Sequence, residues 1–155
     1  MKNKEKWMEY AFHEAEKAYN VEEVPIGAII IKDDKIIGRG YNQTESLKDS
    51  TAHAELISIT SASNTISDWR LNDCSIYVTK EPCLMCFGAI VNSRIKNLFF
   101  GFGDDVNGFK RNININHLFF KKHLSLIESG FLENKCKNIV QDFFVKKRKK
   151  NHKNS

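Results

Sequence analysis

The feature that most constrains this chain is a pair of short motifs. His53 and Glu55 form a His-x-Glu unit, and Pro82, Cys83 and Cys86 form a Pro-Cys-x-x-Cys unit. One imidazole and two thiolates can occupy three corners of a zinc tetrahedron, and a catalytic zinc site leaves the fourth corner for water. Any fold of this chain therefore has to bring the two motifs together.

The spacing of the motif residues assigns them different roles. Cys83 and Cys86 are three positions apart, so they share one face at the start of a helix, where the positive end of the helix dipole favours thiolates. Glu55 lies about 200° around an ideal helix from His53, so we expect it to carry protons rather than bind metal. Zinc lowers the pKa of bound water toward about 7. The predicted chemistry is hydrolytic deamination of a nucleobase.

Two other interpretations of the cysteine motif stay open. A Cys-x-x-Cys unit is also typical of redox sites and of half of a structural zinc finger. A structural site needs a fourth ligand, for which Cys74 and Cys136 are candidates, although neither has a metal-type spacing to the motif. We expect the isolated histidines to be surface or packing residues, namely His13, His117, His123 and His152.

Composition and charge narrow the class of protein. With 155 residues, 41% of them hydrophobic, the chain suits one globular domain over residues 1–148, followed by a basic, disordered tail over 149–155. Residues 121–155 hold ten basic and three acidic residues, a net charge of +7, whereas residues 1–120 carry −2 and the whole chain +5. Such a basic end indicates a phosphate-bearing partner, or simply a solubilising tail.

No hydrophobic run approaches the roughly 20 residues of a membrane span. The charged N-terminus also lacks the apolar centre of a signal peptide. We therefore expect a cytoplasmic protein with no membrane partner.

Periodicity and turn residues predict an α/β chain. Strands are expected at 24–31, 36–42, 75–79, 98–102 and 125–128, and helices at 4–19, 52–63, 83–92, 117–122 and 132–148. Thr51 or Ser50 is the expected N-cap of the second helix, and Pro82 opens the third. Residues 43–50 and 103–116 are expected to be loops. The helical crossover implies that the third and fourth strands are parallel, with the site beyond their carboxyl ends.

Beyond these motifs, the chain resembles the bacterial tRNA-specific adenosine deaminases of the cytidine deaminase superfamily over about residues 5–148. The matching segments are VPIGA (24–28), GYN (40–42), TAHAE (51–55), YVT (77–79), EPCLMC (81–86), SRI (93–95), GFLENKC (130–136) and DFF (142–144). The His-x-Glu and Pro-Cys-x-x-Cys signature is that of zinc deaminases. The resemblance implies a three-layer fold with a central mixed five-stranded sheet in the order 2-1-3-4-5, flanked by helices.

The resemblance also implies an activity, partners and site residues. The activity is conversion of adenosine to inosine at the wobble position of a tRNA anticodon, typically in the arginine tRNA with anticodon ACG. The implied partners are a second copy of the chain, in a homodimer, and the tRNA anticodon stem-loop, and the implied cofactor is one zinc ion per subunit. By position, the ligands are His53, Cys83 and Cys86, the proton shuttle is Glu55, and the RNA contacts are Asn42, Asp104, Phe144, Lys146, Lys147 and Arg148.

One segment departs from the family pattern. After Asp104 the family shows a Lys and a small-residue stretch, whereas this chain has Asp105, Val106 and Asn107 before Gly108. The resemblance therefore does not define which residues after Asp104 contact RNA in this loop.

Two rival functions share these motifs. A deaminase of free bases or nucleosides, acting on guanine or cytosine, has the same zinc signature. A non-catalytic zinc-stabilised RNA-binding module would explain the basic end, but an intact Glu55 and only three evident ligands argue against it.

Overall fold

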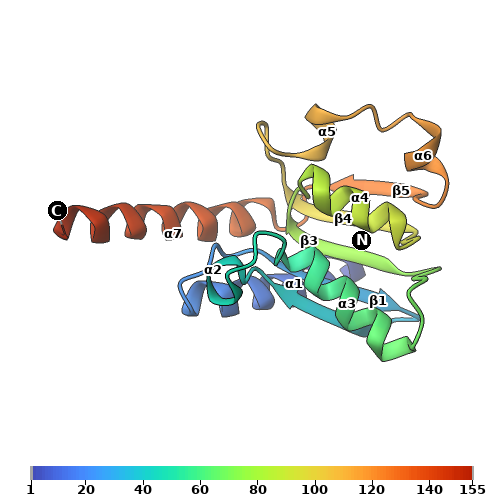
Figure 1. Ribbon diagram of the computed structural model, residues 1–155, viewed down its shortest axis with the longest axis horizontal. Coiled ribbons are helices and arrows are strands. Elements are labelled where there is room, and N and C mark those ends of the chain that lie inside the picture. Colours follow the sequence, from blue (N-terminus) through green and yellow to red (C-terminus); the bar gives the residue numbers. More distant parts are fainter. Residues whose placement is uncertain (1, 155) are drawn as a thin grey trace.

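The computed structural model describes residues 2–154 and is built on one mixed five-stranded sheet, in the order β2-β1-β3-β4-β5 (Figure 1). The order and the mixed pairing confirm the expected sheet. The strands are β1 (Gly27–Lys32), β2 (Lys35–Tyr41), β3 (Ser75–Lys80), β4 (Asn97–Phe102) and β5 (Leu126–Ser129).

The strand directions follow from the connections. β1 and β2 form an antiparallel hairpin whose turn residues, Asp33 and Asp34, both adopt positive φ angles, as a two-residue hairpin turn requires. β1 also pairs antiparallel with β3, whereas the helical crossovers make β3, β4 and β5 parallel to one another. The predicted parallel pairing of the third and fourth strands is confirmed.

Helices cover both faces of the sheet and give three layers. α1 (Lys2–Asn20) and α7 (Glu133–Lys153) pack on one face, and α3 (Ala54–Ile66) and α4 (Leu84–Asn92) pack on the other (Figure 1). β3 shows why both faces are apolar: Ile76 and Val78 point toward α3 and α4, and Tyr77 between them points toward α1 and α7. A strand buried on both faces needs this continuous apolar run.

Glycines let the helices approach the hairpin closely. A Cβ atom on Gly27 would lie 2.1 Å from the Ala11 carbonyl oxygen of α1, and one on Gly40 would lie 2.5 Å from the Ala54 carbonyl oxygen of α3. Contacts this short cannot be relieved without moving the helix backbone. The start of α3, where the His-x-Glu motif lies, is therefore set by a glycine on β2.

Several predicted boundaries are wrong. Residues 43–50 contain a short helix, α2 (Thr44–Leu47), because the buried Glu23 carboxylate accepts hydrogen bonds from the Glu45 and Ser46 N–H groups at 3.2 and 2.6 Å. Residues 103–116 contain α5 (Phe109–Asn112), whose Phe109 ring stacks on Phe87 at 4.0 Å. α6 (Leu118–Lys121) lies within the expected helix at 117–122.

The helix that carries the His-x-Glu motif begins later than expected. α3 starts at Ala54 with His53 as its N-cap, because Asp49 accepts the N–H of Thr51 at 2.8 Å and holds residues 49–52 in a turn. Thr51 and Ser50 are not the cap.

α4 also begins late. It starts at Leu84 with Cys83 as its N-cap, so Pro82 precedes the cap instead of occupying the first helical position. An isolated antiparallel bridge to Gly108 holds Cys83 extended.

α7 is longer than expected. It runs to Lys153, so residues 149–153 are helical where a disordered tail was expected. Figure 1 shows the second half of α7 projecting beyond the sheet. None of the helices described over residues 2–154 is long and apolar enough to cross a membrane.

Candidate active site

Two helix N-termini carry the metal-type residues. His53 is the N-cap residue of α3 and Cys83 is that of α4, and both have an extended backbone. Neither side chain accepts a hydrogen bond from the N–H groups of its own helix. Cys86 lies in the first turn of α4 and is fully buried. Because β3 ends at Lys80, this junction stands just beyond the carboxyl end of the central strand, where the sequence predicts the site.

The three candidate ligand atoms meet at one point. The His53 Nδ1 atom lies 3.7 Å from the Cys83 sulfur and 3.4 Å from the Cys86 sulfur, and all three atoms lie within 4.8 Å of one another. Typical zinc–sulfur and zinc–nitrogen bond lengths place neighbouring ligand atoms of a tetrahedral site about 3.5–3.8 Å apart. The cluster therefore fits a metal ion of the zinc type. Within residues 2–154 neither Cys74 nor Cys136 joins the cluster, so it has no fourth protein ligand.

The two thiols differ in their affinity for a proton. A hydrogen bond from the Cys86 thiol, with a contribution from His53, lowers the pKa of Cys83 to about 4. The neighbouring Cys83 sulfur and burial raise the pKa of Cys86. Without a metal, the pair therefore keeps one proton between two sulfurs. A divalent cation favours the second thiolate and displaces this proton.

Glu55 lies beside the cluster and is not part of it. The side chain is only 4% exposed, and burial raises the pKa of its carboxyl group. A carboxyl group whose pKa is raised by burial is a stronger base, and its acid form can return the proton. This environment suits a proton carrier.

A cavity of about 620 Å³ opens onto the cluster. His53, Glu55 and Cys83 line it together with Asn42, which immediately follows β2. Asn42 is 6% exposed, and its backbone N–H donates to the Ile26 carbonyl oxygen at 3.1 Å. Among the residues that the structure describes, none bonds its carboxamide. The cavity therefore combines a metal-type cluster, a buried carboxyl group and an unpaired amide.

Comparison with known proteins decides the family. The family model of the MafB19-like deaminases matches residues 2–148. The chain belongs to the MafB19-like deaminase family.

Two bacterial relatives match the chain over nearly their whole length. The chain is 42% identical to the tRNA-specific adenosine deaminase of Buchnera aphidicola subsp. Schizaphis graminum, over 92% of this chain and 94% of that protein. It is 39% identical to the tRNA-specific adenosine deaminase of Bacillus subtilis, over 97% and 94% respectively. A structure from studies of A-to-I editing by tRNA:A34 deaminases at the wobble position superposes with a TM-score of 0.77 and 37% identity, over 86% of this chain and 97% of that one.

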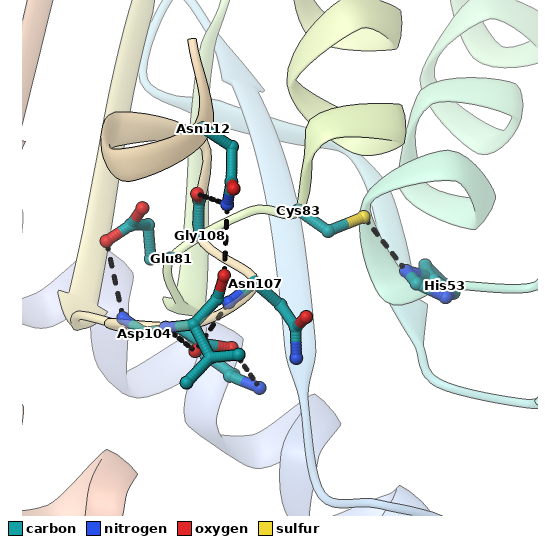
Figure 2. Close-up of polar contacts among 9 residues, drawn as sticks. His53, Glu81, Cys83, Asp104, Asn107, Gly108 and Asn112 are labelled. Atoms are coloured by element: carbon teal, nitrogen blue, oxygen red, sulfur yellow. Dashed lines mark hydrogen bonds and ion pairs between the residues drawn. The ribbon is translucent and has the colours of Figure 1, made fainter.

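In this MafB19-like deaminase, Asp104 lines the same cavity but its carboxylate is engaged within the protein. Its oxygens accept the N–H groups of Val106 and Asn107, both at 3.0 Å, and form an ion pair with Lys80 at 3.0 Å (Figure 2). Burial alone would raise the pKa of Asp104, but these N–H groups and the Lys80 ammonium outweigh it and hold the pKa below its usual value. Asp104 organises its own loop.

Sequence reasoning missed Glu81. This side chain is 8% exposed and lies against the loop that follows β4 (Figure 2). Its carboxylate accepts the N–H groups of Asp104 at 3.3 Å and Lys110 at 3.1 Å. The only sequence signal was an acidic residue directly before the Pro-Cys unit, and this does not reveal its partners.

The expected RNA contacts of α7 are not among the residues that line the cavity. Lys146 and Lys147 line a second hollow of about 410 Å³, together with Tyr19 of α1. Lys146 bonds the Tyr19 hydroxyl group and also pairs with Asp142 at 3.4 Å. Phe144, 39% exposed, packs edge-on against the ring of Phe143, and Arg148 is exposed. None of the four expected contact residues lines the cavity beside Glu55.

The two remaining cysteines are packing residues. Cys74 is buried beside the start of β3, and Cys136 is buried against α1 and the sheet. Burial raises the pKa of both thiols, to about 12 for Cys136. Neither is a reactive group.

Proposed function

We propose that this chain is a zinc-dependent deaminase that converts adenosine to inosine at the wobble position of tRNA. The observation that carries the proposal is the buried Glu55 carboxyl group, which lines one cavity with His53, Cys83 and Asn42. A structural zinc site fills all four coordination positions with protein ligands, whereas a catalytic site leaves one for water. A buried acid beside three ligands therefore fits a catalytic site. The relatives named tRNA-specific adenosine deaminases support the choice of substrate.

Three residues would hold the metal ion in each subunit. They are His53, Cys83 and Cys86, whose nitrogen and sulfur atoms have the donor chemistry and the spacing of zinc ligands. Bound there, zinc supplies Lewis acidity that makes water nucleophilic at neutral pH.

Glu55 performs the proton transfers. The oxygen of water forms a bond to C6 of the adenine ring, and the Glu55 carboxylate takes the proton that the water loses. Glu55 delivers this proton to N1 of the ring, then takes the remaining proton from the new hydroxyl group on C6 and delivers it to the departing amine. The C6–N bond breaks, ammonia leaves, and the product is inosine.

Asn42 holds the flipped base. Enzymes that act on a nucleobase take it out of the stack and read its edge by hydrogen bonds. A carboxamide both donates and accepts, as an adenine edge requires. The Asn42 carboxamide, buried at the cavity wall without a protein partner among residues 2–154, is suited to this role.

The tRNA anticodon stem-loop binds across the cavity and α7. The basic residues of α7 neutralise phosphates, and Phe144 offers an exposed ring for stacking. In this scheme Lys146, Lys147 and Arg148 contact the stem-loop. Asp104 lies next to the RNA in the loop that follows β4, whose conformation it holds. A tRNA substrate implies that the enzyme works in the cytoplasm.

The enzyme acts as a homodimer. α4 presents an apolar face beside the cavity, with Leu84 and Met85 being 49% and 38% exposed. A Cβ atom at Gly88, one turn further along, would meet nothing within 4 Å. An apolar helix face that is open to close approach suits packing against a second copy.

A deamination assay distinguishes this function from its rivals. Purified zinc-loaded protein is incubated with the anticodon stem-loop of the arginine tRNA with anticodon ACG and, separately, with free guanine and free cytidine. We expect inosine in the stem-loop and no turnover of the small molecules. Turnover of only guanine or cytidine would show a free-base or nucleoside deaminase, and stem-loop binding without any turnover would show a non-catalytic RNA-binding module.

A further inference from the structure

The loop between β4 and α5, residues 103–108, is hydrogen-bonded to the segment that contains Cys83, a candidate metal ligand. The Glu81 carboxylate accepts the Asp104 N–H at 3.3 Å (Figure 2). It also accepts the Lys110 N–H, just beyond the other end of the loop, at 3.1 Å. The N–H of Phe109 donates to the Pro82 carbonyl oxygen at 3.0 Å, and Gly108 bridges to Cys83. The loop is thereby fixed relative to a candidate metal ligand.

Internal hydrogen bonds make the same loop rigid. Asp104 accepts two N–H groups of the turn, and the Asn112 carboxamide donates to the Gly108 and Val106 carbonyl oxygens at 2.7 and 3.1 Å (Figure 2). Gly108 has no room for a side chain, since a Cβ atom there would lie 1.9 Å from a Glu81 oxygen. The backbone at Asn107 therefore has little freedom.

Asn107 is the polar side chain that this framework leaves unused. Its backbone N–H is bound to Asp104, but within residues 2–154 no hydrogen bond engages its carboxamide. Asn107 lines the cavity, and Figure 2 shows its carboxamide on the side of the loop that faces Cys83 and His53. A side chain held on a rigid turn at a cavity rim loses little freedom when it binds a ligand.

We propose that Asn107 is a further substrate-contacting residue and that Glu81 is the positioning residue that holds it. Asn107 bonds the base edge of a nucleotide next to the target adenosine. This inference rests on the proposed function, because it presumes an RNA substrate in the cavity.

The location and chemistry of Asn107 decide which group it contacts. Asn42 is buried and serves the base inside the cavity, whereas Asn107 is exposed at the mouth, where the adjoining nucleotides have to pass. A carboxamide both donates and accepts, so it matches a nucleobase edge better than a phosphate, which only accepts. Asn107 therefore selects sequence context and does not take part in the chemistry.

The first test pairs Asn107→Ala with altered stem-loops. Deamination is measured on the normal stem-loop and on two versions, each with an abasic residue on one side of the target adenosine. On the normal stem-loop, Asn107→Ala is expected to raise KM by about 2- to 10-fold, the value of one hydrogen bond, with kcat unchanged. On one of the abasic versions, Asn107→Ala should have no further effect. Asn64→Ala, an exposed asparagine on α3, is the matched control and should leave KM unchanged.

The second test asks whether Asn107 acts through Glu81. Both Glu81 oxygens accept backbone N–H groups, and Glu81→Gln replaces one of these oxygens with an NH₂ group that cannot accept. One hydrogen bond to the loop is lost, so the loop becomes more mobile and KM should rise. In the double variant, the KM should be no higher than that of the worse single variant, because a loosened loop already loses the Asn107 contact. Metal content and the thermal midpoint of unfolding report any damage to the fold. Asn107→Ala tests the substrate contact and leaves the hydrogen bonds of Glu81 to the loop intact.

The outcomes separate this inference from the proposed function. If the wild type deaminates the stem-loop but Asn107→Ala leaves KM unchanged, Asn107 is not a substrate contact. If Asn107→Ala raises KM by the same factor on both abasic stem-loops as on the normal one, neither neighbouring base is the partner of Asn107. Multiplying effects of Glu81→Gln and Asn107→Ala would overturn the positioning role. Failure of the wild type to act on any stem-loop would instead overturn the proposed function.

Discussion

Glu55 is the residue on which the proposed chemistry depends. Its carboxyl group is buried beside three metal-type ligands, and burial raises its pKa. Glu55→Gln keeps the shape of the side chain but removes its ability to carry a proton. We expect kcat for stem-loop deamination to fall by about 10²–10⁴-fold, as for the loss of a general acid–base.

The metal content of Glu55→Gln is the control for that experiment. Because Glu55 is not in the ligand cluster, the variant should bind as much zinc as the wild type. A variant that keeps both its zinc and its full kcat would show that Glu55 is not the proton carrier.

Removal of the metal should change the reactivity of one cysteine in particular. Without metal, Cys83 is a half-buried thiolate with a pKa of about 4, whereas burial raises the pKa of Cys136 to about 12 and also raises that of Cys74. The thiolate is the reactive form, and it dominates above the pKa. Chelator-treated protein exposed to iodoacetamide at pH 7 should therefore be alkylated first at Cys83, as read by peptide mass spectrometry.

Zinc provides the matched control for alkylation. A bound thiolate is protected, so the addition of zinc before iodoacetamide should suppress modification of Cys83 and leave Cys74 and Cys136 as unreactive as before. Equal labelling of Cys83 with and without zinc would argue against its role as a ligand.

At the scale of elements, the position of α3 depends on its packing against β2. A Cβ atom at Gly40 would lie 2.5 Å from the Ala54 carbonyl oxygen and 2.7 Å from the Ser58 nitrogen. Gly40→Ala should therefore push α3 outward, destabilise the fold by about 1–3 kcal/mol, and weaken zinc binding through His53. Urea unfolding and zinc titration measure the two effects.

Gly103→Ala is a suitable comparison for Gly40→Ala. A Cβ atom there has its nearest neighbour at 3.4 Å, an ordinary contact, so its stability should stay close to that of the wild type. If both variants unfold at the same urea concentration, close approach at Gly40 does not set the position of α3.

The sequence predicts the elements and the metal-type cluster because both depend on local patterns. Apolar runs identify the five strands, and the short spacings within the two motifs are enough to predict that His53, Cys83 and Cys86 converge. The crossover rule then places this cluster beyond the end of β3. Each of these inferences needs only neighbouring residues or general topology.

The errors arise where distant residues decide the structure. α2 forms because Glu23 caps it from outside the segment, and α4 begins at Leu84 because Gly108 pairs with Cys83. The hydrogen bond between the Glu81 carboxylate and the Lys110 N–H joins segments that are far apart in the chain, so no spacing rule reveals it. Asn107 is identified only because the structure shows which polar groups the loop leaves unpaired.

At the scale of the whole molecule, the open face of α4 bears on the proposed dimer. A side chain at Gly88 meets nothing within 4 Å in the subunit itself. Gly88→Glu should therefore leave the subunit folded but place a charge in an apolar interface between two copies. We expect sedimentation to show a dimer for the wild type and a monomer for the variant.

Circular dichroism shows whether Gly88→Glu remains folded. A folded variant that stays dimeric would locate the interface elsewhere, and a monomeric wild type at micromolar concentration would contradict the proposed homodimer.

In the proposed function, the cavity at the His53, Cys83 and Cys86 cluster acts on the wobble adenosine of tRNA. The most direct measurement is inosine mapping across total tRNA that has been incubated with the zinc-loaded protein. We predict inosine at the wobble position of tRNAs with an adenosine there, foremost the arginine tRNA with anticodon ACG, and none after incubation with Glu55→Gln. No inosine at any wobble position, or inosine formed equally by Glu55→Gln, would contradict the account.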